Sequence, residues 1–237
     1  MRDVAKITQA VAPTKNLAAT KPDMRTQIIE AAIRELSVNG PEFFDTSKIC
    51  RELFIARSLI NHHFGNQTNL IAEASVNAYE RYVLFLRASA NSKETAEDRL
   101  EAWMAAQASW YEANRGIAVI HQLPHPRFVE IVGRSFNDRM QKHFRFNMSV
   151  LTILVQDVAT QTISDISFEV DDAPYENLTG DISNVFRAGT IGMSVLGSSI
   201  WSAGRNHAER DLPERYLEDA AITQHHKWLI KSIQPKL

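Results

Sequence analysis

The sequence predicts an all-α protein, and three observations support that prediction. Apolar residues recur at spacings of three and four along most segments, as at Ile29 and Ile33, which is the period of an amphipathic helix. Residues that favour helix ends bracket these segments, with Asp23 before the first and Gly40 after it. The segment 46–70 places its apolar side chains where two short helices and the turn between them would bury them.

The same patterns place the expected helices along the chain. Asp23 caps a first helix that reaches about Val38, and the helix that begins at Gln67 is long enough to link an N-terminal unit to the rest. Thr95 followed by Asp98 has the spacing of a capping box. The expected helices cover residues 23–38, 47–53, 57–63, 67–90, 95–114, 126–163, 179–203 and 211–233, with a short helical piece at 116–123.

The longest expected helix begins at Pro126, a residue well suited to the first helical position. Four apolar residues recur at every fourth position and form one expected stripe of this helix: Phe136, Met140, Phe144 and Met148. The segment 164–178 that follows is acidic and contains Pro174. We expect it to be a loop outside the core.

The last two expected helices differ in the size of their apolar residues. The helix 179–203 is rich in small residues, and each interior glycine costs about 1 kcal/mol of helix propensity, so close packing must offset it. Together with the larger residues of the final helix, this pattern favours a four-helix bundle across a twofold axis. The alternative is that both faces pack within one monomer. The candidate interface comprises Gly189, Gly192, Leu196, Ile200, Tyr216, Leu217, Ala220 and Trp228.

The second short helix of the segment 46–70 leaves polar side chains outside its buried set. Ile60 and Phe64 belong to the buried set, whereas Arg57, Ser58 and Asn61 do not. Such polar groups hydrogen-bond to base edges and phosphates when a helix-turn-helix enters the major groove. The segment therefore predicts a DNA-binding unit.

The stretch 49–70 resembles the DNA-binding signature of the tetracycline-repressor (TetR) family of bacterial regulators, usually I-A-x-x-x-G-V-S-x-x-x-L-Y-x-H-F-x-x-K-x-x-L. The matching residues are Ile49, Ile55, Ile60, His63, Phe64 and Leu70. The departures are Phe54 for the turn glycine, Ala56 for the capping serine, Asn61 for a tyrosine and Gln67 for a lysine. Ala56 has no capping oxygen, which typically costs about 1 kcal/mol, and Gln67 lacks the charge that releases a counterion.

Residues 1–22 are rich in Thr, Ala and Lys, show no helical apolar period and end at Pro22, so we expect a mobile tail. The resemblance implies a helix-turn-helix DNA-binding domain at 23–70 and a larger helical effector-binding and dimerisation domain at 71–237. It assigns direct base contacts to Arg57, Ser58 and Leu59. It assigns contacts with the DNA backbone to Thr46, Ser47, Lys48, Asn61, His63 and Gln67. Basic residues of the tail could reach a minor groove, and the alternative is an unstructured leader.

The composition is that of an ordinary globular protein with 44% hydrophobic residues and a net charge of -2. This charge excludes a uniformly basic nucleic-acid binder, so any DNA affinity must come from local placement. Residues 1–70 hold nine Lys and Arg against seven Asp and Glu, whereas the remainder holds seventeen against twenty-one. The single Cys50 fits a reducing cytosol, and no stretch approaches the ~20 apolar residues of a membrane span. We expect a soluble, cytoplasmic protein.

The aromatic and Met residues of the helices 95–114 and 126–163 can line an effector pocket, as in proteins of the resembled family. Each of them can equally be plain core. The polar candidates that would orient a ligand are Gln107, His121 and Asn137. The candidate pocket comprises Trp103, Gln107, Trp110, Tyr111, His121, Phe128, Phe136, Asn137, Met140 and Phe144.

We expect no metal site, no cofactor and no enzymatic activity. His62 and His63 are about 100° apart on a helix and cannot easily share one ion. His121 and His125 are four residues apart, but Pro124 interrupts the helix that would align them. The sequence also contains no phosphate-binding glycine loop, H-E-x-x-H motif or nucleophile elbow.

These patterns predict a ligand-responsive transcriptional regulator, most simply a repressor. It would bind double-stranded operator DNA as a homodimer and respond to a small-molecule effector, with no membrane partner. One alternative is a protein of the same fold that has lost strong DNA binding and binds a small molecule. Another is a helical enzyme or carrier built on the apolar interior.

Overall fold

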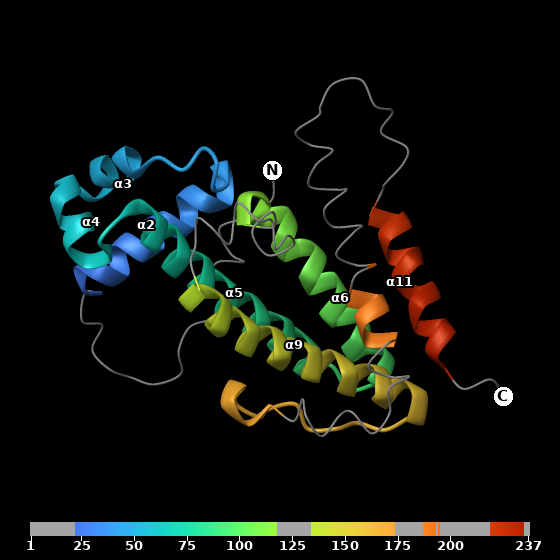
Figure 1. Cartoon of the computed structure of the whole chain (residues 1–237). Coiled ribbons are helices and arrows are strands. Elements are labelled where there is room, and N and C mark those ends of the chain that lie inside the picture. Colours follow the sequence, from blue (N-terminus) through green and yellow to red (C-terminus); the bar gives the residue numbers. More distant parts are fainter. Residues whose placement is uncertain (1–21, 118–133, 174–186, 193, 195–218, 235–237) are drawn as a thin grey trace.

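The protein is described from a computed structural model that covers residues 22–117, 134–173, 187–192, 194 and 219–234. All regular structure within these ranges is helical, which confirms the predicted all-α fold (Figure 1). The elements are α2 (Met24–Asn39), α3 (Thr46–Leu53), α4 (Arg57–Phe64), α5 (Gln67–Asn91), α6 (Ala96–Ala113), α9 (Arg134–Thr160), the 3-10 turn η1 (Val170–Asp172) and α11 (Asp219–Ile233). Residues 187–192 are also helical.

Local capping explains where these helices begin. Asp23 accepts a hydrogen bond from the backbone N–H of Thr26 at 2.7 Å, and Thr95 accepts one from Asp98 at 3.1 Å. Both are the predicted N-caps, and each satisfies a backbone donor that the first turn leaves free. Asp45 and Asn66 cap α3 and α5 in the same way.

Helix α5 joins two hydrophobic clusters and so confirms the predicted link. Its first half, up to Ala78, packs into an N-terminal cluster with α2, α3 and α4. From Tyr79 onward it packs into a larger cluster with α6, α9, α11 and the helical residues 187–192. In Figure 1, α2 to α4 lie at one end of α5, while α9 runs beside it. Any rotation of α5 would therefore act on both clusters.

Two glycines meet where the larger part contacts the N-terminal unit. Gly40 ends α2 with a φ of 69°, and Gly116 lies just after α6. A Cβ added to Gly116 would lie 1.9 Å from the carbonyl oxygen of Leu36 and 2.5 Å from the backbone nitrogen of Gly40. Only glycine permits this approach of two backbones. Next to it, Ile117 is fully buried in the N-terminal cluster.

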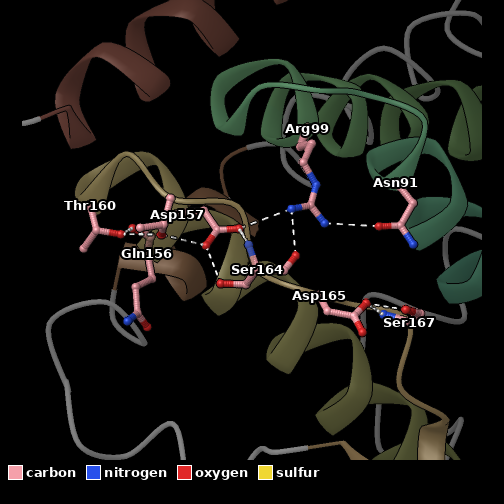
Figure 2. A network of polar contacts seen from close by, with 9 residues as sticks. Asn91, Arg99, Gln156, Asp157, Thr160, Ser164, Asp165 and Ser167 are labelled. Atoms are coloured by element: carbon pink, nitrogen blue, oxygen red, sulfur yellow. Dashed lines mark hydrogen bonds and ion pairs between the residues drawn. The ribbon is translucent and has the colours of Figure 1, made fainter.

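A buried ion pair lies at the end of the larger cluster, where α6 begins and α9 ends (Figure 2). Arg99 and Asp157 are 3% and 1% exposed, and Nη1 of Arg99 lies 3.3 Å from Oδ2 of Asp157. Arg99 also donates to the carbonyl oxygen of Ser164 at 2.9 Å and to Oδ1 of Asn91 at 3.1 Å. The network therefore ties α5, α6, α9 and the following loop together.

The acidic segment after α9 corrects one prediction. It was expected to be a loop outside the core, yet Ile166 is fully buried and Phe168 packs edge-on against Phe146 with ring centroids 5.6 Å apart. The carbonyl oxygen of Phe168 also accepts a hydrogen bond from Arg87 at 2.7 Å. Apolar residues between the acidic ones anchor the segment to the larger cluster.

The predicted stripe on α9 is wrong at Phe144, which is 52% exposed, while Phe146 is fully buried. Helix α9 is covered by neighbours on several sides, because Phe146, Asn147, Val150 and Leu151 are all buried. A period of four residues cannot identify the exposed strip of such a helix. The predicted boundaries also differ: α9 ends at Thr160, before the expected 163, and its expected start at Pro126 lies outside the described residues.

Candidate nucleic-acid interface

Helices α3 and α4 form the predicted helix-turn-helix. Ile49 of α3 and Ile60 and Phe64 of α4 are buried against α2 and α5, at 1%, 0% and 6% exposure. They fix the position of α4 relative to the rest of the unit. Leu53, Ile55 and the single Cys50 pack against the same cluster as partly buried residues.

The turn between the two helices departs from ideal geometry at two positions. Phe54 has φ 56° and ψ 44°, the left-handed conformation that favours glycine, and its side chain is 95% exposed. Ala56 occupies the N-cap of α4 and makes no side-chain cap hydrogen bond, as its sequence predicts. The turn is therefore held by backbone hydrogen bonds, such as that from Ile55 N–H to the carbonyl oxygen of Cys50 at 3.0 Å.

The polar residues of α4 lie on the side that faces away from the cluster. Arg57, Ser58, Asn61 and His62 are exposed, and Leu59 and His63 are partly buried. Among the described residues no carboxylate forms an ion pair with Arg57. Its guanidinium group is therefore available to an outside acceptor, such as guanine O6 and N7 or a phosphate.

Other basic groups of the unit are already paired with carboxylates. Nζ of Lys48 lies 3.1 Å from Oε1 of Glu35, and Arg34 pairs with Glu52. Asp45, which caps α3, is held anionic because the hydrogen bond from the Ser47 backbone N–H lowers its pKa. To contact a phosphate, the Lys48 ammonium group would therefore have to leave Glu35.

Thr46 and Gln67, both predicted to contact the DNA backbone, bond to each other. Thr46 is 3% exposed, and its hydroxyl donates to Oε1 of Gln67 at 2.8 Å. Gln67 also donates to the carbonyl oxygen of Phe44 at 3.4 Å. A DNA contact from Thr46 would have to use its backbone N–H, at the N-terminus of α3. These assignments stay predictions.

Ion pairs that the sequence pattern does not reveal connect this unit to α9. The guanidinium carbon of Arg25 lies 5.2 Å from the ring centre of Phe64, at the end of α4. Arg25 also lies 3.3 Å from Glu73 of α5, which in turn pairs with Arg139 of α9 at 3.1 Å. The pairing residues are 48 and 66 positions apart in the chain, so no local motif signals them.

The candidate pocket residues on α6 lie inside the larger cluster. Trp103, Gln107 and Tyr111 are buried, and Trp110 is partly buried. Trp110 stacks obliquely on Tyr82, with ring centroids 5.9 Å apart. Burial raises the pKa of Tyr111 and of Tyr82, so both hydroxyls remain protonated.

The other pocket candidates lie on or before α9. Met140 is partly buried and packs against the larger cluster, whereas Phe144 is exposed, as described above. Phe136 and Asn137 belong to the first turn of α9. His121 and Phe128 lie outside the described residues. Of the candidates whose side chains the structure describes, those on α6 and Met140 thus share the larger cluster, whereas Phe144 does not.

The candidate dimer interface is described in part. A Cβ added to Gly189 would meet no atom within 4 Å, whereas one on Gly192 would lie 3.3 Å from Leu151. Trp228 of α11 is 63% exposed, and Ala220 belongs to the same helix. The remaining candidates, Leu196, Ile200, Tyr216 and Leu217, lie outside the described residues.

The described ranges contain neither a candidate metal site nor a candidate membrane span. No group of three or more His, Cys, Asp or Glu side chains in these ranges could hold a metal ion. None of the helices in the same ranges is long and apolar enough to cross a membrane.

Comparison with known proteins identifies the fold. No protein-family profile and no curated protein matches the sequence. Solved structures do match: a regulatory protein of the tetR family from Rhodococcus RHA1 has a TM-score of 0.59 at 16% identity, covering 90% of this chain and 98% of that one. The fatty acid degradation regulator FadR from Bacillus halodurans has a TM-score of 0.60 at 14% identity, and the match covers 92% of this chain and 100% of that one. FadR from Bacillus subtilis in complex with stearoyl-CoA has a TM-score of 0.56 at 13% identity, and the match covers 90% of this chain and 98% of that one.

The fold and the site therefore define a helical protein with an N-terminal helix-turn-helix unit carried on a larger helical body. That architecture is the fold of the tetR-family regulatory protein from Rhodococcus RHA1, with which this chain aligns along 98% of that protein's length. The predicted resemblance, drawn from residues 49–70 alone, is confirmed at the level of the fold.

Proposed function

We propose that the protein is a sequence-specific DNA-binding transcriptional regulator that acts as a homodimer and represses its target until a small-molecule effector binds. The observation that carries this proposal is the exposed set at the start of α4, with Arg57 unpaired among the described residues, on a helix-turn-helix of the TetR fold. Residues 23–70 would bind the operator, and residues 71–237 would bind the effector and the second subunit.

Base recognition would come from Arg57, Ser58 and Leu59 at the N-terminal end of α4. A guanidinium group binds the two acceptors of guanine in the major groove, and a leucine contacts the thymine methyl group. Asn61, His63 and the N-terminal turn of α3, with Ser47 and Lys48, would fix the unit on the phosphates. These contacts would place the two copies of α4 about 34 to 36 Å apart, or a helical repeat more, on successive major grooves.

Effector control would act through α5. This helix contributes Ala78 to the N-terminal cluster and Tyr79 to the larger one, so a ligand that rotates it would change the separation of the two α4 helices. The ligand shifts the equilibrium only by its difference in affinity for the two arrangements. An apolar effector suits the interior, and the FadR complex with stearoyl-CoA gives a related fold that holds a molecule with a long apolar chain.

Dimerisation would use α11 and the helix that includes residues 187–192. Trp228 is 63% exposed on α11, and a second subunit packed on this helix would cover it. The absence of a Cβ at Gly189, with open space in front of it, would let a second helix approach closely.

A second candidate is a protein of the same fold with weak DNA binding. The missing cap at Ala56, the strained turn at Phe54 and the pairing of Lys48 with Glu35 favour it. Such a protein would function by binding a small molecule in its helical interior. An enzyme on this scaffold has no specific observation in its favour.

Selection from a random pool of duplex DNA with the purified full-length protein tests the proposal. We expect enrichment of a palindromic site whose half-sites are about 10 base pairs apart, or a helical repeat more, at moderate salt. A pool that stays random even at low salt would contradict sequence-specific binding and support the second candidate. Arg57→Ala, tested in parallel, should abolish the enrichment.

A further inference from the structure

Within the part of the chain that the structure describes, three buried polar atoms beside the larger cluster lack a hydrogen-bond partner. They are the indole Nε1 of Trp103, the indole Nε1 of Trp110 and the hydroxyl of Ser149. Trp103 is 1% exposed and Ser149 is fully buried. Burying a donor without a partner costs free energy that a packed core normally avoids. Such atoms are expected where a ligand supplies the missing acceptors.

The two indoles lie on one face of α6, with Gln107 between them. Positions 103, 107 and 110 are separated by four and three residues, so they stand above one another along the helix. With a rise of 1.5 Å per residue, Trp103 and Trp110 are about 10 Å apart along the axis. Among the described residues, Nε2 of Gln107 donates to the carbonyl oxygen of Gly192 at 3.4 Å, which is longer than a well-formed N–H···O bond.

Trp103, Gln107 and Trp110 together form a strip on α6. Each of its three side chains carries an N–H group. Around them the cluster is aromatic and aliphatic: the ring of Trp110 lies 5.9 Å from Tyr82 and 5.7 Å from Phe85. The strip therefore offers donors spaced along an apolar wall. A molecule that satisfies it needs acceptor oxygens at two places along an otherwise apolar body.

Charged side chains beside this part of the cluster already have partners among the described residues. Arg87, whose guanidinium carbon lies 5.4 Å from the ring centre of Phe146, donates to the carbonyl oxygen of Phe168 at 2.7 Å. Arg99 faces Asp157 at 3.3 Å, and the ring of His143 lies 3.3 Å from Glu80 and 2.8 Å from the carbonyl oxygen of Arg139. A ligand carboxylate would have to break one of these pairs or stay uncompensated, which is costly in an apolar interior. Neutral acceptors carry no such cost.

We infer that the effector is an elongated, neutral, apolar molecule whose ester or ketone oxygens lie about two helical turns apart, accepting hydrogen bonds from Trp103 and Trp110, with Gln107 between them. The hydroxyl of Ser149 donates to the same molecule from α9. This inference rests on the proposed function, since it names the chemical class that the regulator senses.

The inference is tested with the full-length protein, labelled with 15N at the indole nitrogens, and three matched probes. Dimethyl sebacate carries two neutral esters at the ends of a ten-carbon chain, sebacate carries two charges on the same skeleton, and dodecane has no acceptor. Trp103→Phe and Trp110→Phe assign the resonances. We expect the diester to move both indole N–H proton signals downfield, and sebacate and dodecane to leave both unchanged.

Affinity for the diester provides the second readout. Trp103→Phe should weaken binding by roughly five- to tenfold, because one hydrogen bond is lost while the aromatic surface is largely kept. Phe43→Leu, at an aromatic side chain that is 75% exposed in the N-terminal unit, is the control and should bind the diester as the natural protein does. Two results overturn the inference: unmoved indole signals with the diester, or equal affinity for the diester and sebacate.

Ser149→Ala separates a ligand contact from a structural one. Because its hydroxyl has no partner among the residues that the structure places, its removal should leave the thermal midpoint of the free protein unchanged or higher, while weakening diester binding. A lower midpoint with unchanged binding would refute its role. A protein that selects an operator but ignores the diester refutes only this inference, and one that binds the diester but selects no operator refutes only the proposed function.

Discussion

Replacing Asp157 by alanine should destabilise the protein more than any charge change on its surface. The carboxylate, 1% exposed, accepts hydrogen bonds from the Ser164 backbone N–H at 2.9 Å, the Ser164 hydroxyl at 2.6 Å and the Thr162 hydroxyl at 3.2 Å. It also faces Arg99 at 3.3 Å. In the described ranges, the variant would leave the buried guanidinium with two acceptors, the carbonyl oxygen of Ser164 and the amide oxygen of Asn91.

Breaking one side of a buried ion pair costs about 3 to 5 kcal/mol, and we expect the free energy of unfolding to fall by that amount. The converse variant, Arg99→Met, should cost less, since Asp157 keeps its three donors from Ser164 and Thr162. The double variant should be more stable than Asp157→Ala alone, because the uncompensated charge is gone.

Urea unfolding followed by circular dichroism measures these changes, provided that the slope with urea is the same for all variants. The matched control is Glu52→Gln, which breaks a pair with Arg34 whose side chains are 48% and 57% exposed. Surface pairs are worth about 0 to 1 kcal/mol. If Asp157→Ala cost no more than Glu52→Gln, burial of the network would not have the energetic weight assigned to it.

Three further variants test the turn, the glycine contact and a half-buried ion pair. Phe54→Gly should raise the free energy of unfolding by about 1 kcal/mol, because a φ of 56° strains any residue with a side chain and the 95% exposed ring loses no packing. An unchanged urea midpoint would show that Phe54 is not strained. Gly116→Ala should lower the free energy of unfolding by about 3 kcal/mol, since the new Cβ would lie 1.9 Å from the Leu36 carbonyl oxygen. A loss below about 1 kcal/mol in urea unfolding would show that the contact can relax. Arg81 lowers the pKa of Glu30 by its hydrogen bond, so their pair stabilises the fold above the unfolded pKa near 4.5, and this stabilisation is lost as the pH falls through the lower folded pKa. The difference in free energy of unfolding between the natural protein and Glu30→Gln, at most about 1 kcal/mol, should therefore stay constant above pH 4.5 and shrink below it. A difference that grew in acid would contradict this sign.

Local patterns predicted the parts of the molecule that depend on neighbours in the sequence. Asp23 and Thr95 cap helices because a side-chain oxygen reaches a backbone N–H three residues on, and this needs no knowledge of the fold. The buried positions Ile49, Ile60 and Phe64 likewise follow from helical spacing within one short segment.

Features that depend on distant contacts were out of reach of the sequence. Arg99 and Asp157 are 58 residues apart, and each alone looks like a solvated charge on an amphipathic helix. In the sequence, Gly116 marks only the start of a short helical piece, because its approach to Gly40 arises from the docking of two units. Phe144 was misplaced because α9 has neighbours on several sides, so its apolar residues do not form one stripe.

The central claim is that Arg57 reads a base on a specific duplex, and the affinity of Arg57→Ala for the selected operator and for a scrambled duplex tests it most directly. Arg34→Ala, which removes the same charge from α2, is the control. We expect Arg57→Ala to cost about 1 to 3 kcal/mol per half-site on the operator and clearly less on scrambled DNA, with Arg34→Ala near the natural protein on both. Equal losses on the two duplexes would contradict base recognition by Arg57.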